Sequence, residues 1–290
     1  MRRRVGHEKY RITRASFDVI SVFPALAATA VPGPVFSAVL QLHGYGPSAV
    51  RNRLVRMVHQ GQLVSDRSGR ASLYRVHPAL QEKMDQLRSR LHPPTFDGHF
   101  HMVVHAIPES ERQLRDRLTY LARYLEYRAL RPGVLLGFVD RSERLSHKLR
   151  GAMECSDDSW FSFGTVVPPS EEAAESWVRR AFLCDGVSEK IGALEARIER
   201  LAPTGDGGEL ISYMDALYDV LWLFNEVAVL PAEFTHLSDD DARLFALLEK
   251  LDAFYREHCD IRVVEKALSV PAARLIEYEE TDAVDALPKE

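Results

Sequence analysis

The stretch from Gly46 to Val76 constrains the fold of this chain more than any other, because it sets a short amphipathic helix directly before a tight hairpin. Apolar residues recur at Val50, Leu54, Met57 and Val58. This is the spacing of a helix with one buried stripe. The stretch therefore predicts a helix that packs one face on a core and leaves the other face free.

The hairpin after this helix has a basic tip, formed by Arg67-Ser68-Gly69-Arg70. Gly61 ends the helix, and the runs Leu63-Val64 and Leu73–Val76 are β-prone strands on either side of the tip. A helix followed at once by such a hairpin is typical of a winged helix-turn-helix, which makes double-stranded DNA the first partner to consider. The alternative is a helix and a hairpin in an unrelated α+β domain.

We expect DNA contacts from the face opposite the apolar stripe, from the flanks of the helix and from the hairpin tip. A helix lying in a major groove brings such side chains to phosphates or to the edges of bases. The predicted DNA-binding residues are Ser48, Ala49, Arg51, Asn52, Arg53, Arg56, Arg67, Ser68 and Arg70.

Charge is distributed unevenly along the chain. Residues 1–92 hold 15 Lys and Arg against 5 Asp and Glu, whereas the other 198 residues hold 22 against 37. Cations gathered on one module can neutralise phosphates. Charge alone would also fit RNA, an anionic membrane or an ordinary solvated face, and the helix and hairpin favour DNA among these.

Two further apolar helices are expected before the amphipathic helix, over Ser16–Leu26 and Pro34–Leu42, with residues 27–33 as their connection. Three helices and a hairpin would complete the DNA-binding module. The basic start and the apolar run after it also resemble a secretory signal. Asp18 and Pro24 interrupt that run and argue against this second interpretation.

With 290 residues, of which 46% are hydrophobic and 27% charged, the chain can bury a sizeable core. We expect three domains, over residues 1–92, 95–168 and 169–290. No apolar run reaches the ~18 residues of a membrane span. The 3 cysteines are far apart and in no metal-binding spacing. These features predict a cytoplasmic protein with reduced thiols, no membrane partner and no cofactor.

The middle domain alternates strands and helices. Strands are expected at His99–Ile107, Gly133–Val139 and Trp160–Val167, with helices at Glu109–Tyr127 and Ser142–Met153. This order predicts a ferredoxin-like sandwich, so the predicted fold class is α+β, with an N-terminal winged helix-turn-helix and a helical C-terminal domain. The expected C-terminal helices cover Glu171–Cys184, Ser188–Leu201, Glu209–Val229, Ser238–His258 and Arg262–Ala267, followed by a loose acidic tail after Ala273.

Six short motifs follow one another in a characteristic order over most of residues 16–260. They are Val50–Met57, Gly61-Gln62-Leu63, Gly69–Val76, Asp97-Gly98, Arg131-Pro132-Gly133-Val134 and Leu230-Pro231-Ala232-Glu233. In these motifs the chain resembles the PaaX family, repressors of phenylacetate catabolism. The resemblance implies a repressor with a winged helix, a ferredoxin-like middle domain and a helical C-terminal domain, whose effector is an aromatic acyl-coenzyme A thioester.

Such an effector needs cations for its phosphates and apolar walls for its acyl group. The candidate effector-binding residues are Arg128, Arg131, Arg141, Arg144, Trp222 and Phe224. The chain departs from the family at Phe96, at His99 and in the run Leu223-Phe224-Asn225-Glu226. A different small aromatic or polyketide-like molecule is therefore the alternative effector.

Two polar clusters suggest metal sites at first sight. His99, His101 and His105 alternate on one face of a predicted strand, as ligands of Zn²⁺ or Ni²⁺ can do, but they lack the Cys or carboxylate partners of a closed site. Partly exposed strand histidines are the alternative. Asp239-Asp240-Asp241 directly follows Ser238 and is better explained as a capped helix start with acids at the positive end of the dipole.

Catalytic motifs are missing from the sequence, since it contains no Gly-x-Ser-x-Gly, no His-Glu-x-x-His and no Cys beside a clear base. We therefore expect a regulator rather than an enzyme, a repressor that binds a partly palindromic operator as a homodimer and responds to a small molecule. Two alternatives remain. One is a nucleolytic enzyme that uses the ferredoxin-like domain, with the winged helix as its targeting module, and the other is a winged helix that binds protein.

Overall fold

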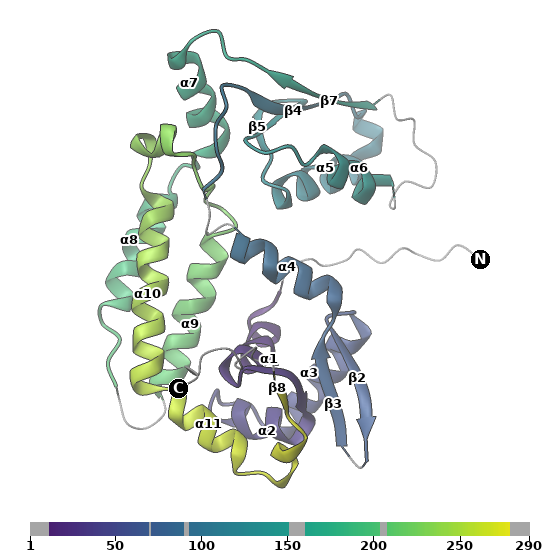
Figure 1. The fold of residues 1–290 in the computed structure, drawn as a ribbon, viewed down its shortest axis with the longest axis vertical. Helices are drawn as coiled ribbons and strands as arrows, with labels where there is room; N and C mark the ends of the chain where they lie inside the picture. The colour runs from purple at the N-terminus through teal and green to yellow at the C-terminus, as the bar shows by residue number, and fades with distance from the viewer. Residues whose placement is uncertain (1–11, 70, 90–92, 151–159, 204–207, 279–290) are drawn as a thin grey trace, which may run out of the picture. The chain divides into compact units, whose positions relative to one another are not determined.

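The computed structural model describes residues 12–69, 71–89, 93–150, 160–203 and 208–278. Its helices and two sheets form a mixed α+β structure, which confirms the predicted fold class at this level (Figure 1). Contacts divide the chain into two compact units, each built from separate segments. The first unit comprises residues 1–88, 197–218 and 249–290, and the second comprises residues 89–196 and 219–248.

The first unit begins with the three helices and the hairpin that the sequence predicts, followed by one further helix. They are α1 (Arg14–Ala25), α2 (Gly33–Gln41), α3 (Pro47–His59), β2 (Leu63–Ser68), β3 (Ala71–Val76) and α4 (Pro78–Ser89). Thr13 caps α1, where its hydroxyl oxygen accepts a hydrogen bond from the Ser16 backbone N–H at 3.3 Å. Positive φ angles of 66° at Gly61 and 60° at Gly69 bend the chain after α3 and at the hairpin tip.

Two strands of the first unit are corrections to the sequence prediction. Residues 27–33, expected to be a connection, contain β1 (Ala28–Pro32), and the tail expected to be loose contains β8 (Glu277–Tyr278). The sheet has the order β2-β3-β1-β8, with β1 antiparallel to both its neighbours. Both strands are short, and their partners lie far away in the sequence. Local sequence patterns therefore did not reveal them.

Apolar side chains of α1, α2 and α3 meet the sheet in the core of the first unit. Phe36 is fully buried, and its ring packs edge-on against Phe23 at 5.4 Å and against Tyr74 of β3 at 5.9 Å between centroids. From the far end of the chain, α11 (Asp260–Leu268) packs on α2 (Figure 1). The three N-terminal helices and the hairpin therefore share one core with the C-terminal residues.

The second unit contains a sheet with β-α-β-β-α-β connections. Its elements are β4 (Phe100–His105), α5 (Arg112–Tyr124), β5 (Arg128–Arg131), β6 (Val134–Gly137), α6 (Ser142–Arg150) and β7 (Phe161–Val166). The strands are antiparallel in the order β5-β6-β4-β7. The strand predicted over Gly133–Val139 is present as β6, and the prediction missed β5, which forms a hairpin with β6. Gly133 turns this hairpin at φ 77°, and a Cβ there would lie 2.7 Å from the His105 carbonyl oxygen.

Both faces of this second sheet are covered by apolar side chains. On one face, Val103 and Phe161 pack with Leu118 of α5 and Leu145 of α6. On the other face, a second cluster joins Phe100, Leu136 and Phe138 to Ala174, Val178 and Phe182 of α7 (Glu171–Phe182). Burial on both faces makes this sheet a structural centre of the second unit.

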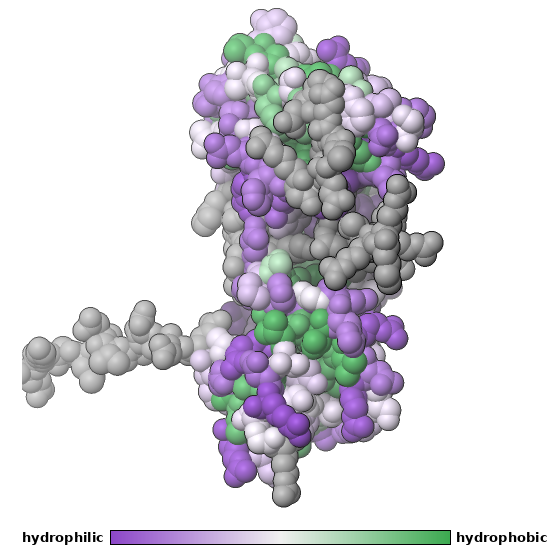
Figure 2. All heavy atoms as spheres, turned by 90° about the vertical axis from the view of Figure 1, so that its right-hand side faces the viewer, coloured by the Kyte–Doolittle hydropathy of each residue, from purple (hydrophilic) through white to green (hydrophobic). Residues whose placement is uncertain are grey.

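The remaining helices are α8 (Val187–Ile198), α9 (Gly208–Leu223) and α10 (Asp240–His258). Ser238 accepts a hydrogen bond from the Asp240 N–H at 3.2 Å, and Asp240 and Asp241 lie in the first turn of α10, which confirms the predicted capped start. Hydrophilic residues cover much of the face drawn in Figure 2, with smaller hydrophobic patches among them. No helix of the described chain is long and apolar enough to cross a membrane.

Candidate nucleic-acid interface

Helix α3 supplies the principal surface of the candidate interface. It begins at Pro47, after Gly46, and proline suits this first position because its missing N–H would have no partner within the helix. Val50, Leu54 and Met57 are each at most 2% exposed and form the buried stripe, whereas Val58, also predicted to belong to it, is only half-buried. The stripe anchors α3 in the first unit and determines which of its faces points to solvent.

The opposite face of α3 is exposed and carries no acid. Arg53 is half-buried at its side, and the exposed residues are Ser48, Ala49, Arg51, Asn52, Val55, Arg56 and His59. The helix contains no Asp or Glu, and Arg56 and His59 lie in its last turn, where the helix dipole favours positive charge. The α3 face combines cations, an amide and one large apolar side chain, Val55, at helical spacing.

Four arginines of the predicted interface lie within the described residues and have no hydrogen-bond or ion-pair partner there. Arg51, Arg53 and Arg56 lie on α3, and the exposed Arg67 lies on β2 near the hairpin tip with the half-buried Ser68. Among the residues that the structure describes, these four side chains make no hydrogen bond and no ion pair. Arg70, also predicted to bind DNA, lies outside the described residues.

Ion pairs that the sequence did not reveal link β3 of the hairpin to β2 and to β8. Arg75 of β3 pairs with Asp66 of β2 and, at 2.7 Å, with Glu277 of β8. The hydrogen bond to Glu277 is the largest cause that raises the pKa of the Arg75 guanidinium. Through this ion pair, β8 contacts β3 and neutralises one of its cations.

A buried carboxylate stabilises the turn that leads into α3. Asp18 of α1 is 1% exposed, and its two oxygens accept hydrogen bonds of 2.6 Å from Arg14 Nη1 and from the Tyr45 hydroxyl. His43 Nδ1 lies 3.8 Å from the same carboxylate. Because Tyr45 directly precedes Gly46, the N-cap of α3, this bond positions the start of the helix.

The chemistry of this cluster keeps Tyr45 neutral. Burial, followed by the hydrogen bond to Asp18, raises the pKa of the Tyr45 phenol to about 12. Arg14 also pairs with Asp215 of α9 at 3.0 Å, and the Tyr218 hydroxyl donates to the Ile12 carbonyl at 3.0 Å. From the sequence alone, Asp18 is an interruption of an apolar run. A lone acid at a buried helical position is the signal that could have found this cluster.

The basic excess of residues 1–92 does not extend over the whole first unit. The C-terminal segments in the unit are acidic, so the unit as a whole has 22 Lys and Arg against 20 Asp and Glu. The basic excess of the unit therefore belongs to residues 1–88, which hold 14 Lys and Arg against 5 Asp and Glu, and its C-terminal segments offset it. A helix without acids on a nearly neutral unit concentrates its field where a ligand could lie along α3.

The predicted effector residues all belong to the second unit but have different surroundings. Arg128 is 6% exposed and donates to the carbonyls of Arg123 at 2.9 Å and Tyr127 at 3.2 Å. Arg141 pairs with Glu126 at 2.7 Å. Phe224 is buried against Phe245, Trp222 is half-buried, and Arg131 and Arg144 are exposed.

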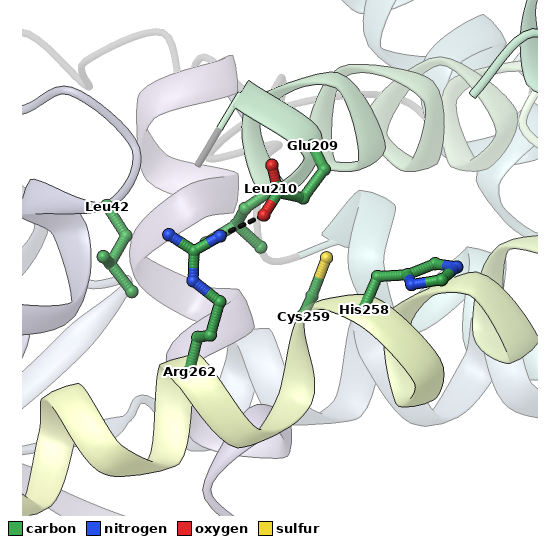
Figure 3. A pocket seen from close by; sticks show the side chains of 6 residues that line it. All are labelled: Leu42, Glu209, Leu210, His258, Cys259 and Arg262. Atoms are coloured by element: carbon green, nitrogen blue, oxygen red, sulfur yellow. Dashed lines mark hydrogen bonds and ion pairs between the residues drawn. The ribbon is translucent and has the colours of Figure 1, made fainter. Parts of the chain in front are cut away.

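Pockets in the two units are small. In the second unit, a cavity of about 20 Å³ is lined by Arg128, Glu126, Phe138 and Phe182 together with apolar residues of 227–229. In the first unit, Figure 3 shows a cavity of about 10 Å³, where Arg262 reaches the buried Glu209 above Cys259. A volume of ~10–15 Å³ holds about one water molecule. Neither cavity has room for an aromatic ring in this conformation.

The predicted histidine cluster is only partly assembled. The rings of His99 and His101 lie 5.0 Å apart, and His99 Nδ1 lies 3.0 Å from an Asp97 oxygen. Across the described ranges, no group of three His, Cys, Asp or Glu side chains is placed to hold a metal ion. His105, at the end of β4, is half-buried.

Comparisons with known proteins place the chain by its fold. No protein-family model matches it, and no curated protein matches its sequence. Among solved structures, it is similar to the uncharacterized protein Rv0674 from Mycobacterium tuberculosis, with a TM-score of 0.53 and 16% sequence identity. The likeness covers 84% of this chain and 99% of that one. At this identity it shows a similar fold and nothing about activity.

Proposed function

We propose that this chain is a ligand-responsive DNA-binding regulator, a repressor that uses α3 as its recognition helix and β2-β3 as its wing. The observation that carries the proposal is the exposed face of α3, which has three arginines beside it or on it, no acid, and no ion pair within the described chain. Unengaged cations on one helix face suit a polyanion with a groove as wide as a helix.

The order of elements supports the same proposal. Three helices followed by a hairpin match a winged helix-turn-helix, and the β-α-β-β-α-β connections of the second unit match a ferredoxin-like domain. The motifs shared with the PaaX family support a repressor among proteins with these parts. The proposed location is the cytoplasm, where DNA is accessible.

Selection of duplexes from a random DNA library tests the proposal. Full-length protein should enrich a partly palindromic sequence, and Arg51→Ala with Arg56→Ala should weaken binding to it by about tenfold or more, since each arginine neutralises or reads part of the DNA. Arg179→Ala with Arg180→Ala is the matched control, because these two arginines are exposed on α7 of the second unit. Equal losses in both variants, or no enriched duplex, would contradict the proposal.

A nucleolytic role is tested with the same duplex. Protein, labelled duplex and Mg²⁺ or Mn²⁺ are incubated together, and the products are separated on a denaturing gel. We expect intact strands, because a repressor binds its operator without cleaving it. Metal-dependent cleavage that Arg51→Ala weakens would replace the repressor with a nuclease targeted by the same helix.

We further propose that the regulator acts as a homodimer. One helix in one major groove gives modest specificity, and two copies of α3 spaced by about 34 Å, one turn of DNA, would read two half-sites. Light scattering of the full chain at micromolar concentration should give twice the mass of 32.8 kDa. A monomer under these conditions would remove the dimer from the proposal.

The proposed effector is a small aromatic or acyl-coenzyme A molecule that binds the second unit near Arg128, Arg131, Arg141, Arg144, Trp222 and Phe224. Because the cavity beside Arg128 measures about 20 Å³, binding requires that it open. Phenylacetyl-coenzyme A, phenylacetate and coenzyme A are titrated separately into the DNA complex and followed by anisotropy. Release by the thioester, lost in Arg131→Ala with Arg144→Ala, is the expected result.

A further inference from the structure

Val55 is an apolar residue in the middle of the exposed α3 face. Its side chain is 48% exposed, and it is the one large apolar residue of α3 that is exposed to this degree. Successive helical residues are rotated by about 100°, so Val55 points away from its buried neighbour Leu54. Ser48 lies seven residues before Val55 and Asn52 three before, which places all three on the same side of the helix.

Folding of the first unit does not account for this valine. Val50, Leu54 and Met57 already form the buried stripe of α3, each at most 2% exposed. A β-branched residue at an exposed helical position has lower helix propensity than alanine or a charged residue, and its apolar surface gains nothing from water. Single exposed apolar residues are common on protein surfaces; what distinguishes Val55 is its position near Asn52, on a helix face that carries arginines and no acid.

We propose that Val55 contacts the 5-methyl group of a thymine in the half-site that α3 reads; this inference rests on the proposed DNA-binding function. The thymine methyl is the apolar group that base edges expose in the major groove. Asn52 lies beside Val55, and an asparagine amide can bind the N6 and N7 atoms of adenine with two hydrogen bonds. The pair favours a half-site in which an adenine and a thymine are read by adjacent turns of α3.

The test replaces thymine by 2′-deoxyuridine, which lacks the 5-methyl group and keeps all base pairing. In the duplex enriched by selection, each thymine is replaced in turn, symmetrically in both half-sites, and affinity is measured by anisotropy at fixed salt. At one position, wild-type protein should lose about fourfold in affinity per half-site, the value of one buried methyl group. Val55→Ala should bind the thymine duplex more weakly and show no difference between thymine and deoxyuridine.

Val104→Ala is the matched control, because Val104 is a valine of β4 that is 39% exposed outside α3. It should keep the wild-type preference for thymine. Far-UV circular dichroism verifies folding of Val55→Ala, in which alanine raises helix propensity. An unchanged thymine preference in Val55→Ala, or no preference in the wild type, overturns this inference while DNA binding stands. Failure to enrich any duplex would instead overturn the proposed function and this inference with it.

Discussion

The arginines of α3 and two arginines of the second unit, Arg128 and Arg141, differ in what surrounds them. Arg51 and Arg56 are exposed and make no hydrogen bond or ion pair with the residues that the structure describes. In the second unit, Arg128 donates to two backbone carbonyls and Arg141 pairs with Glu126. A guanidinium whose Nη atoms are already bonded to its own chain contributes to the fold, whereas one without such bonds is available to a phosphate or a base.

Pairing, and not the unit in which an arginine lies, separates the two groups. Arg75 belongs to the same unit as α3, yet Asp66 and Glu277 neutralise it. In the second unit, Glu126 has a φ of 68°, a left-handed conformation that glycine adopts more easily, and its carboxylate holds Arg141 at 2.7 Å. Two of the predicted effector arginines, Arg128 and Arg141, therefore already make contacts within the second unit when no ligand is bound.

The largest effect is expected from Arg128→Met. Arg128 is 6% exposed, and its loss would leave the carbonyl oxygens of Arg123 and Tyr127 without these hydrogen bonds in a buried site. We expect the free energy of unfolding of the second unit to fall by about 3 kcal/mol. All 3 tryptophans lie in this unit, at positions 160, 177 and 222, so urea unfolding followed by tryptophan fluorescence reports on it.

Arg131→Ala is the control for this prediction, because Arg131 is exposed on the same strand β5. Its effect on unfolding should stay within about 0.5 kcal/mol. If Arg128→Met were as stable as the wild type and responded less to an effector, Arg128 would belong with the available arginines. The distinction between arginines bonded within their own chain and available arginines would then not hold for Arg128.

A second large effect is expected at Asp18, which accepts a hydrogen bond from Tyr45 in the turn before α3. Asp18→Asn keeps the shape of the side chain but removes the charge that Arg14 and the Tyr45 hydroxyl contact at 2.6 Å. A hydrogen bond to a charged group contributes about 2 kcal/mol, so the free energy of unfolding should fall by about 2 kcal/mol. DNA affinity should fall as well, because the turn before α3 loses a fixed position.

Thermal unfolding followed by circular dichroism and binding to the selected duplex measure the two effects of Asp18→Asn. Asp66→Asn is the matched control: Asp66 is an exposed acid of the same unit, with 68% of its side chain accessible. An exposed ion pair contributes about 0–1 kcal/mol, so this variant should unfold nearly as the wild type does. Full DNA affinity in Asp18→Asn would show that α3 does not depend on the buried carboxylate.

A smaller effect should separate Arg51 from Arg75 within the first unit. Arg51→Ala should lower the slope of log affinity against log salt by about one unit, because one phosphate contact is lost. Arg75→Ala should leave the slope unchanged, since Glu277 and Asp66 already neutralise that guanidinium. The slopes are measured by anisotropy between low and physiological salt. Equal slopes in the two variants would show that pairing does not decide which arginines reach DNA.

Local pattern predicted α3 and its surroundings well. The stripe Val50, Leu54 and Met57 is buried as expected, and Arg51 and Asn52 are exposed as expected. Helical spacing alone determines which of these residues face the core, so no knowledge of the rest of the chain is needed. The same spacing places Val55 outside the stripe, although its exposure follows only from the structure.

Features that depend on distant partners were not predictable. β1 is short and pairs with β8 across 248 residues, where Thr29 donates to the Glu277 carbonyl. Burial of Arg128 depends on carbonyls that the turn after α5 brings together, and the residue type suggested a surface cation instead. The sequence indicates that a charged residue is present, whereas the fold decides whether it is already satisfied.

The smallest effect is expected from His105, on which an arginine of the second unit acts. Burial first, and then the charge of Arg115, lower the pKa of the His105 imidazole below 6.5. The unfolded chain therefore takes up this proton before the folded chain does as pH falls. Stability from neutral His105 is fully present above pH 6.5 and is lost as pH falls through 6.5 toward the folded pKa.

We expect the second unit to unfold at lower urea at pH 5.5 than at pH 7.5, with the tryptophans as reporters. His105→Gln removes the titrating group and should shrink this difference, and Arg115→Gln should shrink it less, because burial is the larger cause. Arg115 is itself paired with Glu109 at 2.6 Å, so its loss also tests whether a paired arginine still acts on a buried neighbour. An identical acid sensitivity in His105→Gln and the wild type would assign the loss of stability to other groups. It would also remove Arg115 from the cations that influence the interior of the second unit.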